Sequence, residues 1–153
     1  MNNKEEKYTL LTKQIEALIA GETDMIAVMS NVCAAIHEEM GFFWTGFYRV
    51  HDGELLLGPF QGPVACMHIG YGRGVCGTAW QQQQTIVVPD VEQFPGHIAC
   101  SSLSRSEIVV PVFNASGSVF AVLDIDSKDL STFDDTDRHY LEAICRLMTP
   151  LAA

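Results

Sequence analysis

Three cysteines in the middle of the chain have neighbours that are unusual for packed thiols. Cys66, Cys76 and Cys100 lie next to glycines, histidines and other polar residues, in the strings VACMHIGYGRGVCGTAW and FPGHIACSSLSRSE. A thiol among turn residues can reach solvent and ionise, whereas a thiol in an apolar core stays inert. Three such thiols within one short span predict a protein that carries out thiol chemistry.

Cationic neighbours favour ionisation of two of these thiols. A reactive cysteine needs a helix N-terminus or a nearby cation, because an unperturbed thiol is only slightly ionised at neutral pH. Cys76 follows Arg73 and lies where a helix is expected to begin, and Cys100 follows His97 by three residues. Any one of these cysteines could instead be a small hydrophobic packing residue.

A zinc site is the main alternative use of the same residues. Cys66-x-His68 and His97-x-x-Cys100, with Cys76 between them, offer sulfur and nitrogen donors that suit zinc. The cysteine pairs two to four residues apart that mark most zinc sites are missing. We therefore expect no bound metal and no other cofactor.

Carboxylates form a second group of candidate functional residues. Asp124 and Asp126 alternate with apolar residues at the end of an expected strand, so that both project from the same face. Glu107 begins the strand that we expect to pair with it. Neighbouring carboxylates beside a pocket raise one another's pKa toward that of a proton donor. A solvated sheet face and a helix cap are the alternatives, but the apolar surroundings favour a buried functional group.

The remaining cysteines and most aromatic residues read as packing residues. Cys33 and Cys145 lie between apolar residues in expected helices, and we predict that both are core residues. Five aromatic residues crowd one short segment, and most of them must be core, with room for one to line a pocket: Phe42, Phe43, Trp44, Phe47 and Tyr48.

The spacing of apolar residues predicts three long helices. The first covers residues 4–20, with apolar residues at Leu10, Leu11, Ile15, Leu18 and Ile19. The second covers residues 23–40, between an N-cap at Thr23 or Asp24 and a stop at Gly41. The last begins near residues 134–135 and ends near Pro150.

Strands and one short helix fill the middle of the chain. Residues 42–50 and 53–60 read as two strands around His51-Asp52-Gly53, and a hairpin is expected around residues 114–117. Further elements are a strand at residues 64–69, a helix from about residue 75, a strand at 85–88 and a long connection at 90–106. Helices, then mostly adjacent strands, then a helix predict an α+β fold with an antiparallel sheet.

Size and charge limit the classes of partner. The 153 residues suffice for one domain, and 19 acidic against 9 basic side chains give a formal charge of −10. Nucleic acid and anionic membranes are therefore poor partners. We expect a cytoplasmic protein, because the first residues lack the apolar block of a signal peptide and no apolar run could span a bilayer. In that reducing compartment a transient catalytic disulfide is more plausible than a structural one.

Five strings together resemble the free methionine-(R)-sulfoxide reductases, a family of single GAF domains. They are GPFQGPVAC at 58–66, GRGVCGTAW at 72–80, GHIAC at 96–100, SEIVVP at 106–111 and VLDIDS at 122–127. Each is weak alone, but together, in family order from the second helix to the last, they are specific. The resemblance implies one GAF domain over residues 1–153, with residues 1–22 as a helical appendage. It implies a central antiparallel sheet with helices on one side and a small enclosed pocket on the other.

The resemblance also implies a role for each candidate residue. Cys100 matches the attacking thiol, Cys66 the resolving thiol and Cys76 an auxiliary third cysteine. The carboxylates of Glu107, Asp124 and Asp126 match those that hold the substrate and help to protonate its oxygen, and Trp44 matches an aromatic wall of the pocket. The chain departs from the family at Ser101-Ser102, where an acidic residue commonly follows the attacking cysteine.

The implied reaction reduces free L-methionine-(R)-sulfoxide to methionine. A sulfoxide oxygen leaves only when it is protonated, so an acid must lie opposite the thiolate. Attack by Cys100 would leave a sulfenic acid, which a second thiol converts to a disulfide. Thioredoxin would reopen that disulfide by exchange. The resemblance also suggests a homodimer, and the alternative is a GAF sensor that binds a small ligand without turning it over.

Overall fold

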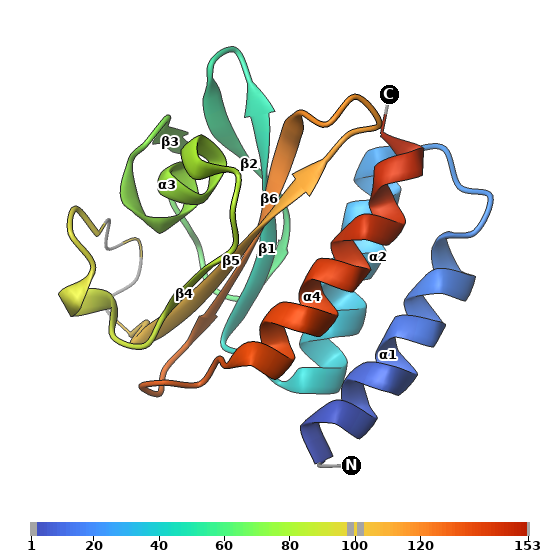
Figure 1. Ribbon diagram of the computed structural model, residues 1–153, viewed down its shortest axis with the longest axis horizontal. Coiled ribbons are helices and arrows are strands. Elements are labelled where there is room, and N and C mark those ends of the chain that lie inside the picture. Colours follow the sequence, from blue (N-terminus) through green and yellow to red (C-terminus); the bar gives the residue numbers. More distant parts are fainter. Residues whose placement is uncertain (1–2, 98–99, 101–102, 153) are drawn as a thin grey trace.

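A six-stranded antiparallel sheet forms the centre of the protein. The computed structural model describes residues 3–97, 100 and 103–152. The strands lie in the order β3-β2-β1-β6-β5-β4, and every neighbouring pair is antiparallel. Helices α2 and α4 cover one face of the sheet and α1 packs against both of them, while α3 and the longest loops lie on the other face (Figure 1). This arrangement confirms the α+β fold with its antiparallel sheet.

Side-chain caps begin two of the three long helices. Helix α1 spans Asn3–Ile19, α2 spans Met25–Met40 and α4 spans Asp135–Met148. The Asp24 side chain caps α2, and Gly41 closes that helix in the left-handed conformation that glycine adopts without steric cost. Asp134 forms a capping box with Asp137 at the start of α4. None of the described helices is both long and apolar enough to cross a membrane.

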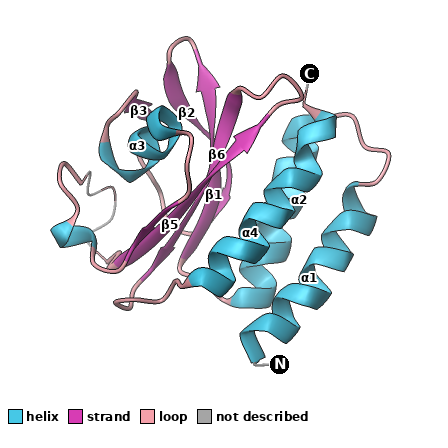
Figure 2. Cartoon of the chain, in the orientation of Figure 1, coloured by secondary structure: helices cyan, strands magenta, loops and turns pink. Residues whose placement is uncertain are grey.

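The six strands are short, and a tight hairpin turn joins the first two. They are β1 at Trp44–His51, β2 at Glu54–Gln61, β3 at His68–Gly70, β4 at Ile86–Val88, β5 at Ser106–Phe113 and β6 at Val119–Ser127. Asp52 and Gly53 both have positive φ angles, as a two-residue hairpin turn between β1 and β2 requires. A short helix, α3 at Gly74–Gln82, follows β3, and single helical turns occupy Val91–Gln93 and Thr149–Leu151 (Figure 2).

Alternation along the strands separates two buried clusters. Phe47, Ile108 and Leu123 point to the face that α2 and α4 cover, and there they join the larger core. Residues one position away, such as Tyr48 and Val122, point to the opposite face and pack under α3. Because successive side chains of a strand point to opposite faces, one face of the sheet packs in the larger core and the other face packs under α3.

One expectation about these elements is wrong in part. The strand predicted at residues 64–69 is shorter and spans His68–Gly70, where it pairs with β2, so Cys66 lies in the preceding loop. The predicted first helix is confirmed by α1, in which Leu11, Ile15 and Ile19 are buried and Leu10 and Leu18 are about half exposed. The burial stripe of α1 instead includes Tyr8, whose hydroxyl donates to buried Asp137 of α4 at 2.6 Å.

Candidate active site

A small cavity lies on the sheet face opposite α1, α2 and α4. Its volume is about 50 Å³, and its wall includes residues of β1, β3, α3, β5, β6 and the loops around them. The polar and aromatic residues that line it are Phe43 just before β1, Trp44 and Tyr48 of β1, Arg73 and Cys76 at the start of α3, His97, Cys100 and Ser104 of the 94–105 loop, Glu107 of β5, and Asp124 and Asp126 of β6. The sheet thus brings together residues that are up to 82 positions apart between Trp44 and Asp126.

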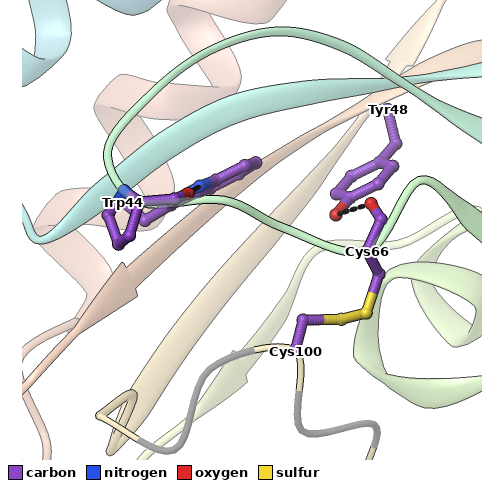
Figure 3. Close-up of a disulfide and its surroundings, with 5 residues drawn as sticks. Trp44, Tyr48, Cys66 and Cys100 are labelled. Atoms are coloured by element: carbon purple, nitrogen blue, oxygen red, sulfur yellow. Dashed lines mark hydrogen bonds between the residues drawn. A yellow bond between two sulfur atoms is a disulfide. The ribbon is translucent and has the colours of Figure 1, made fainter.

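Two of the three candidate thiols are joined at this cavity. Cys66 and Cys100 form a disulfide with a Cα–Cα distance of 5.4 Å, within the range for unstrained pairing. Both residues are half-buried, so a reductant can approach the bond. Cys100 lines the cavity itself, whereas Cys66 reaches it from the loop above (Figure 3). The long connection at residues 90–106 is therefore part of the site.

Two hydrogen bonds from β1 hold the loop that carries Cys66. The Tyr48 hydroxyl donates to the Cys66 carbonyl at 2.8 Å, and Trp44 Nε1 donates to the Pro63 carbonyl at 2.9 Å (Figure 3). These bonds replace the strand pairing that the sequence predicts for residues 64–67. They explain why the chain passes over the cavity at these residues. Pairing with β2 resumes at Met67, whose carbonyl accepts a hydrogen bond from the backbone N–H of Leu57 at 2.8 Å.

Glycines leave room for the Trp44 ring. A Cβ atom at Gly46 would lie 2.5 Å from the ring, and one at Gly62 would lie 2.7 Å from it. Distances below 3.0 Å do not occur for real Cβ atoms, so either substitution would displace the ring. Trp44 also stacks on Phe60, with ring centroids 5.3 Å apart. The indole is therefore fixed as a wall of the cavity.

Three carboxylates form the floor of the cavity. Glu107 lies directly opposite Asp126 in the β5–β6 pair, and Asp124 follows on the same face. Burial, and then the charges of Asp124 and Asp126, raise the pKa of Glu107 well above its ordinary value. Burial also raises the pKa of Asp124, although hydrogen bonds from Glu107 and Cys76 lower it in part. Asp126 is partly exposed, and its pKa is raised by burial and by Asp124.

Cys76 differs from the other two thiols. It lines the same cavity but is only 4% exposed and has a free thiol. Burial, followed by the charges of Asp124 and Glu107, raises its pKa well above the ordinary value. The expectation that Arg73 and a helix start make Cys76 reactive is therefore wrong for this form of the protein.

The zinc site considered from the sequence is not assembled. His68 Nδ1 contacts Glu54 on the surface, and the Cys66 sulfur is bonded to Cys100. His97 lines the cavity, and burial lowers its pKa, which favours the neutral imidazole. Ser101 and Ser102, at the departure from the family pattern, lie outside the described residues.

Tyr48 also lines the cavity, although the sequence did not single it out as a site residue. It shares a strand face with Trp44 because the two are four residues apart on β1, and its ring centroid lies 6.0 Å from that of Trp44. Period-two alternation from Trp44 would have identified it.

The predicted packing role of Cys33 and Cys145 is confirmed, since both are buried, and burial raises the pKa of Cys33 to about 12.

Comparisons with known proteins agree with this site. The model of the GAF domain family matches residues 22–150. GAF domain-containing protein A of Dictyostelium discoideum is 56% identical over 147 residues, which are 95% of this chain and 92% of the relative. The free methionine-R-sulfoxide reductase of Escherichia coli is 44% identical over 143 residues, 93% of this chain and 86% of that enzyme.

A solved structure shows the same fold throughout. The free methionine-R-sulfoxide reductase of Neisseria meningitidis, crystallised in complex with its substrate, superposes with a TM-score of 0.94 and 49% sequence identity. The match covers 97% of this chain and 90% of that one. The resemblance seen in the five sequence strings is thereby confirmed. The chain belongs to the GAF domain family and, within it, to the group of the free methionine-R-sulfoxide reductases.

Proposed function

We propose that this protein reduces free L-methionine-(R)-sulfoxide to L-methionine. The observation that carries the proposal is a disulfide-forming pair of thiols beside a cavity with three carboxylates in its floor. The cavity is far smaller than the roughly 300–1,000 Å³ of sites for drug-sized ligands, which favours a free amino acid over a residue within a polypeptide.

Cys100 is the proposed nucleophile and Cys66 the resolving thiol. In the first step the Cys100 thiolate displaces methionine as the sulfoxide oxygen is protonated and transferred, which leaves Cys100 as a sulfenic acid. In the second step the Cys66 thiol attacks that sulfur, the disulfide forms and one water leaves. The 5.4 Å Cα–Cα distance supports this pairing, and the position of Cys100 in the cavity wall supports its role as the attacking thiol.

Glu107 is the proposed proton donor. A general acid must be protonated at the working pH and must lie close to the atom that it protonates. Glu107 is buried at the cavity floor, and burial, followed by the charges of Asp124 and Asp126, raises its pKa well above the ordinary value. The carboxylates of Asp124 and Asp126 would then hold the substrate ammonium group.

The start of α3 suits the carboxylate of the substrate. The first backbone N–H groups of a helix have no partner within the helix and attract anions. Arg73 occupies the N-cap position of α3 without a side-chain capping bond, and Gly74, Val75 and Cys76 line the cavity there. Opposite charges at the two ends of the cavity would therefore orient an amino-acid zwitterion.

An external dithiol must reopen the disulfide, and thioredoxin is the proposed reductant. Exchange would oxidise the reductant by two electrons, so one dithiol is consumed for each sulfoxide reduced. We also propose, from the resemblance alone, that the protein is a cytoplasmic homodimer with one GAF domain per chain, to which residues 1–22 add a helix.

A coupled assay with both substrate epimers tests the proposal. NADPH oxidation through thioredoxin reductase and thioredoxin should require the protein and free L-methionine-(R)-sulfoxide, while the S epimer should give no signal. Tight binding of a small molecule without NADPH oxidation by either epimer, from protein with reduced thiols, would favour a GAF sensor instead.

A further inference from the structure

Three side chains in the cavity are close enough to hold one metal ion together. The Sγ atom of Cys76 and carboxylate oxygens of Glu107 and Asp124 all lie within 4.8 Å of one another. Cys76 is 4% exposed, and Glu107 and Asp124 are each 6% exposed. Ligand atoms around tetrahedral zinc lie about 3.3–3.8 Å apart, given bonds of about 2.0–2.3 Å. Side-chain shifts of about one ångström would therefore complete three corners of a tetrahedron.

One buried oxygen in this group has no partner. Oδ1 of Asp124 is inaccessible to solvent and makes no hydrogen bond to the described part of the chain. A buried carboxylate oxygen without a partner is costly, and native proteins usually satisfy such atoms with a bound ion or water. The described lysines and arginines form no ion pair with Glu107 or Asp124. A cation between the two carboxylates would satisfy this oxygen and reduce their mutual repulsion.

The donor atoms select the kind of ion. A sulfur ligand suits Zn²⁺ or Cd²⁺, whereas Mg²⁺ and Ca²⁺ prefer oxygen ligands alone. A metal can enter from solvent, because Val64 lines the same cavity and is 87% exposed. Three protein ligands would leave the fourth position to a water molecule.

We propose that Cys76, Glu107 and Asp124 form a Zn²⁺-binding site within the cavity. This site uses none of the histidines of the zinc motif considered from the sequence, and it does not need Cys66 or Cys100. A consequence rests on the proposed function: zinc would occupy the carboxylates assigned to the substrate, so metal and sulfoxide would exclude each other. Zinc would then inhibit the protein without touching its disulfide-forming thiols.

The disulfide form of the full chain allows a direct test with Co²⁺, a spectroscopic substitute for Zn²⁺. In that form Cys66 and Cys100 cannot bind metal as thiolates, and Cys33 and Cys145 are buried in the core beside the helices. Co²⁺ should produce a thiolate-to-metal charge-transfer band at one equivalent, and Zn²⁺ should abolish it. The band should be lost in Cys76→Ser and kept in the control Cys145→Ser. Absence of the band in the wild type, or its survival in Cys76→Ser, would overturn the site.

Mutual exclusion is tested separately in the double variant Cys66→Ser/Cys100→Ser, which cannot turn over. Calorimetric titration with L-methionine-(R)-sulfoxide should show binding without metal and markedly weaker binding after one equivalent of Zn²⁺. Equal affinity in both titrations would refute the exclusion. Lack of sulfoxide binding without metal would count against the proposed function, while the cobalt band alone decides the metal site.

Discussion

Replacing Tyr48 by phenylalanine removes one hydroxyl from the cavity wall and tests whether that hydroxyl positions Cys66. The hydroxyl donates to the Cys66 carbonyl at 2.8 Å, and burial raises the pKa of Tyr48, so the group stays a neutral donor. A hydrogen bond of this kind contributes about 0.5–1.5 kcal/mol, which is about a two- to twelvefold change in an equilibrium. Because the bond is only partly buried, water can replace the hydroxyl, and the lower half of this range is expected.

The affected step should be the formation of the disulfide. Without the bond, the loop spends less time in the conformation that places Cys66 beside Cys100. The attack of Cys66 on the Cys100 sulfenic acid should therefore slow by at most about twelvefold. In a single turnover without reductant, methionine release should be nearly unchanged, while the later loss of free thiols should slow a few-fold. Tyr140→Phe is the matched control, since its hydroxyl lies near Thr9 among the helices. An unchanged rate of thiol loss would refute the reasoning, as would a slowing far beyond twelvefold.

Three further predictions concern the thiols and the acid. Cys100→Ser should abolish methionine formation while Cys145→Ser retains it, and turnover in Cys100→Ser would sink the nucleophile assignment. Cys66→Ser should release about one methionine per enzyme and then stall with thioredoxin as reductant; full cycling would assign resolution to another thiol. The raised pKa of Glu107 means that the acid is protonated below that pKa, so turnover should fall as pH rises through it. Glu107→Gln should remove this alkaline limb from the pH–rate profile, and a limb that persists would assign proton donation to another group.

The same carboxyl makes stability depend on pH. A group whose folded pKa is raised binds its proton more tightly in the folded than in the unfolded protein. Its favourable contribution is fully present below the unfolded pKa of about 4.3 and is lost as pH rises through the folded pKa. Denaturant titrations should therefore show the free energy of unfolding falling with pH over this window, with a smaller fall in Glu107→Gln. Equal slopes in the two proteins would contradict the assigned shift.

Elements with strong local signals were predictable from the sequence. Asp24 and Gly41 bound the second helix, and Asp52-Gly53 forms the first hairpin turn, because capping and turn formation depend on residues a few positions apart. The shared face of Asp124 and Asp126 follows from the period of a strand in the same way. These features involve no contact distant in sequence.

The loop at residues 64–67 could not be predicted in this way. Its four residues are all apolar, as in a buried strand, and nothing within the segment shows that Trp44 and Tyr48 donate hydrogen bonds to the carbonyls of Pro63 and Cys66. Such contacts join residues 18 or 19 positions apart and depend on the registers of β1 and β2. Tertiary hydrogen bonds therefore override the local preference for a strand.

Two opposing effects act on the pKa of the Cys76 thiol, and the larger one decides whether the thiol is ionised. A helix N-terminus stabilises a negative charge by about 0.3–1 kcal/mol, which is less than one pKa unit. Burial can raise a pKa by about 3–5 units, and here it acts together with repulsion from Asp124 and Glu107. The local sequence displays only the weaker, favourable effect, since both carboxylates come from strands more than 30 residues away. In the disulfide form Cys76 is therefore a protonated thiol, and only a ligand that compensates the negative charges, such as a metal cation, would make it ionise.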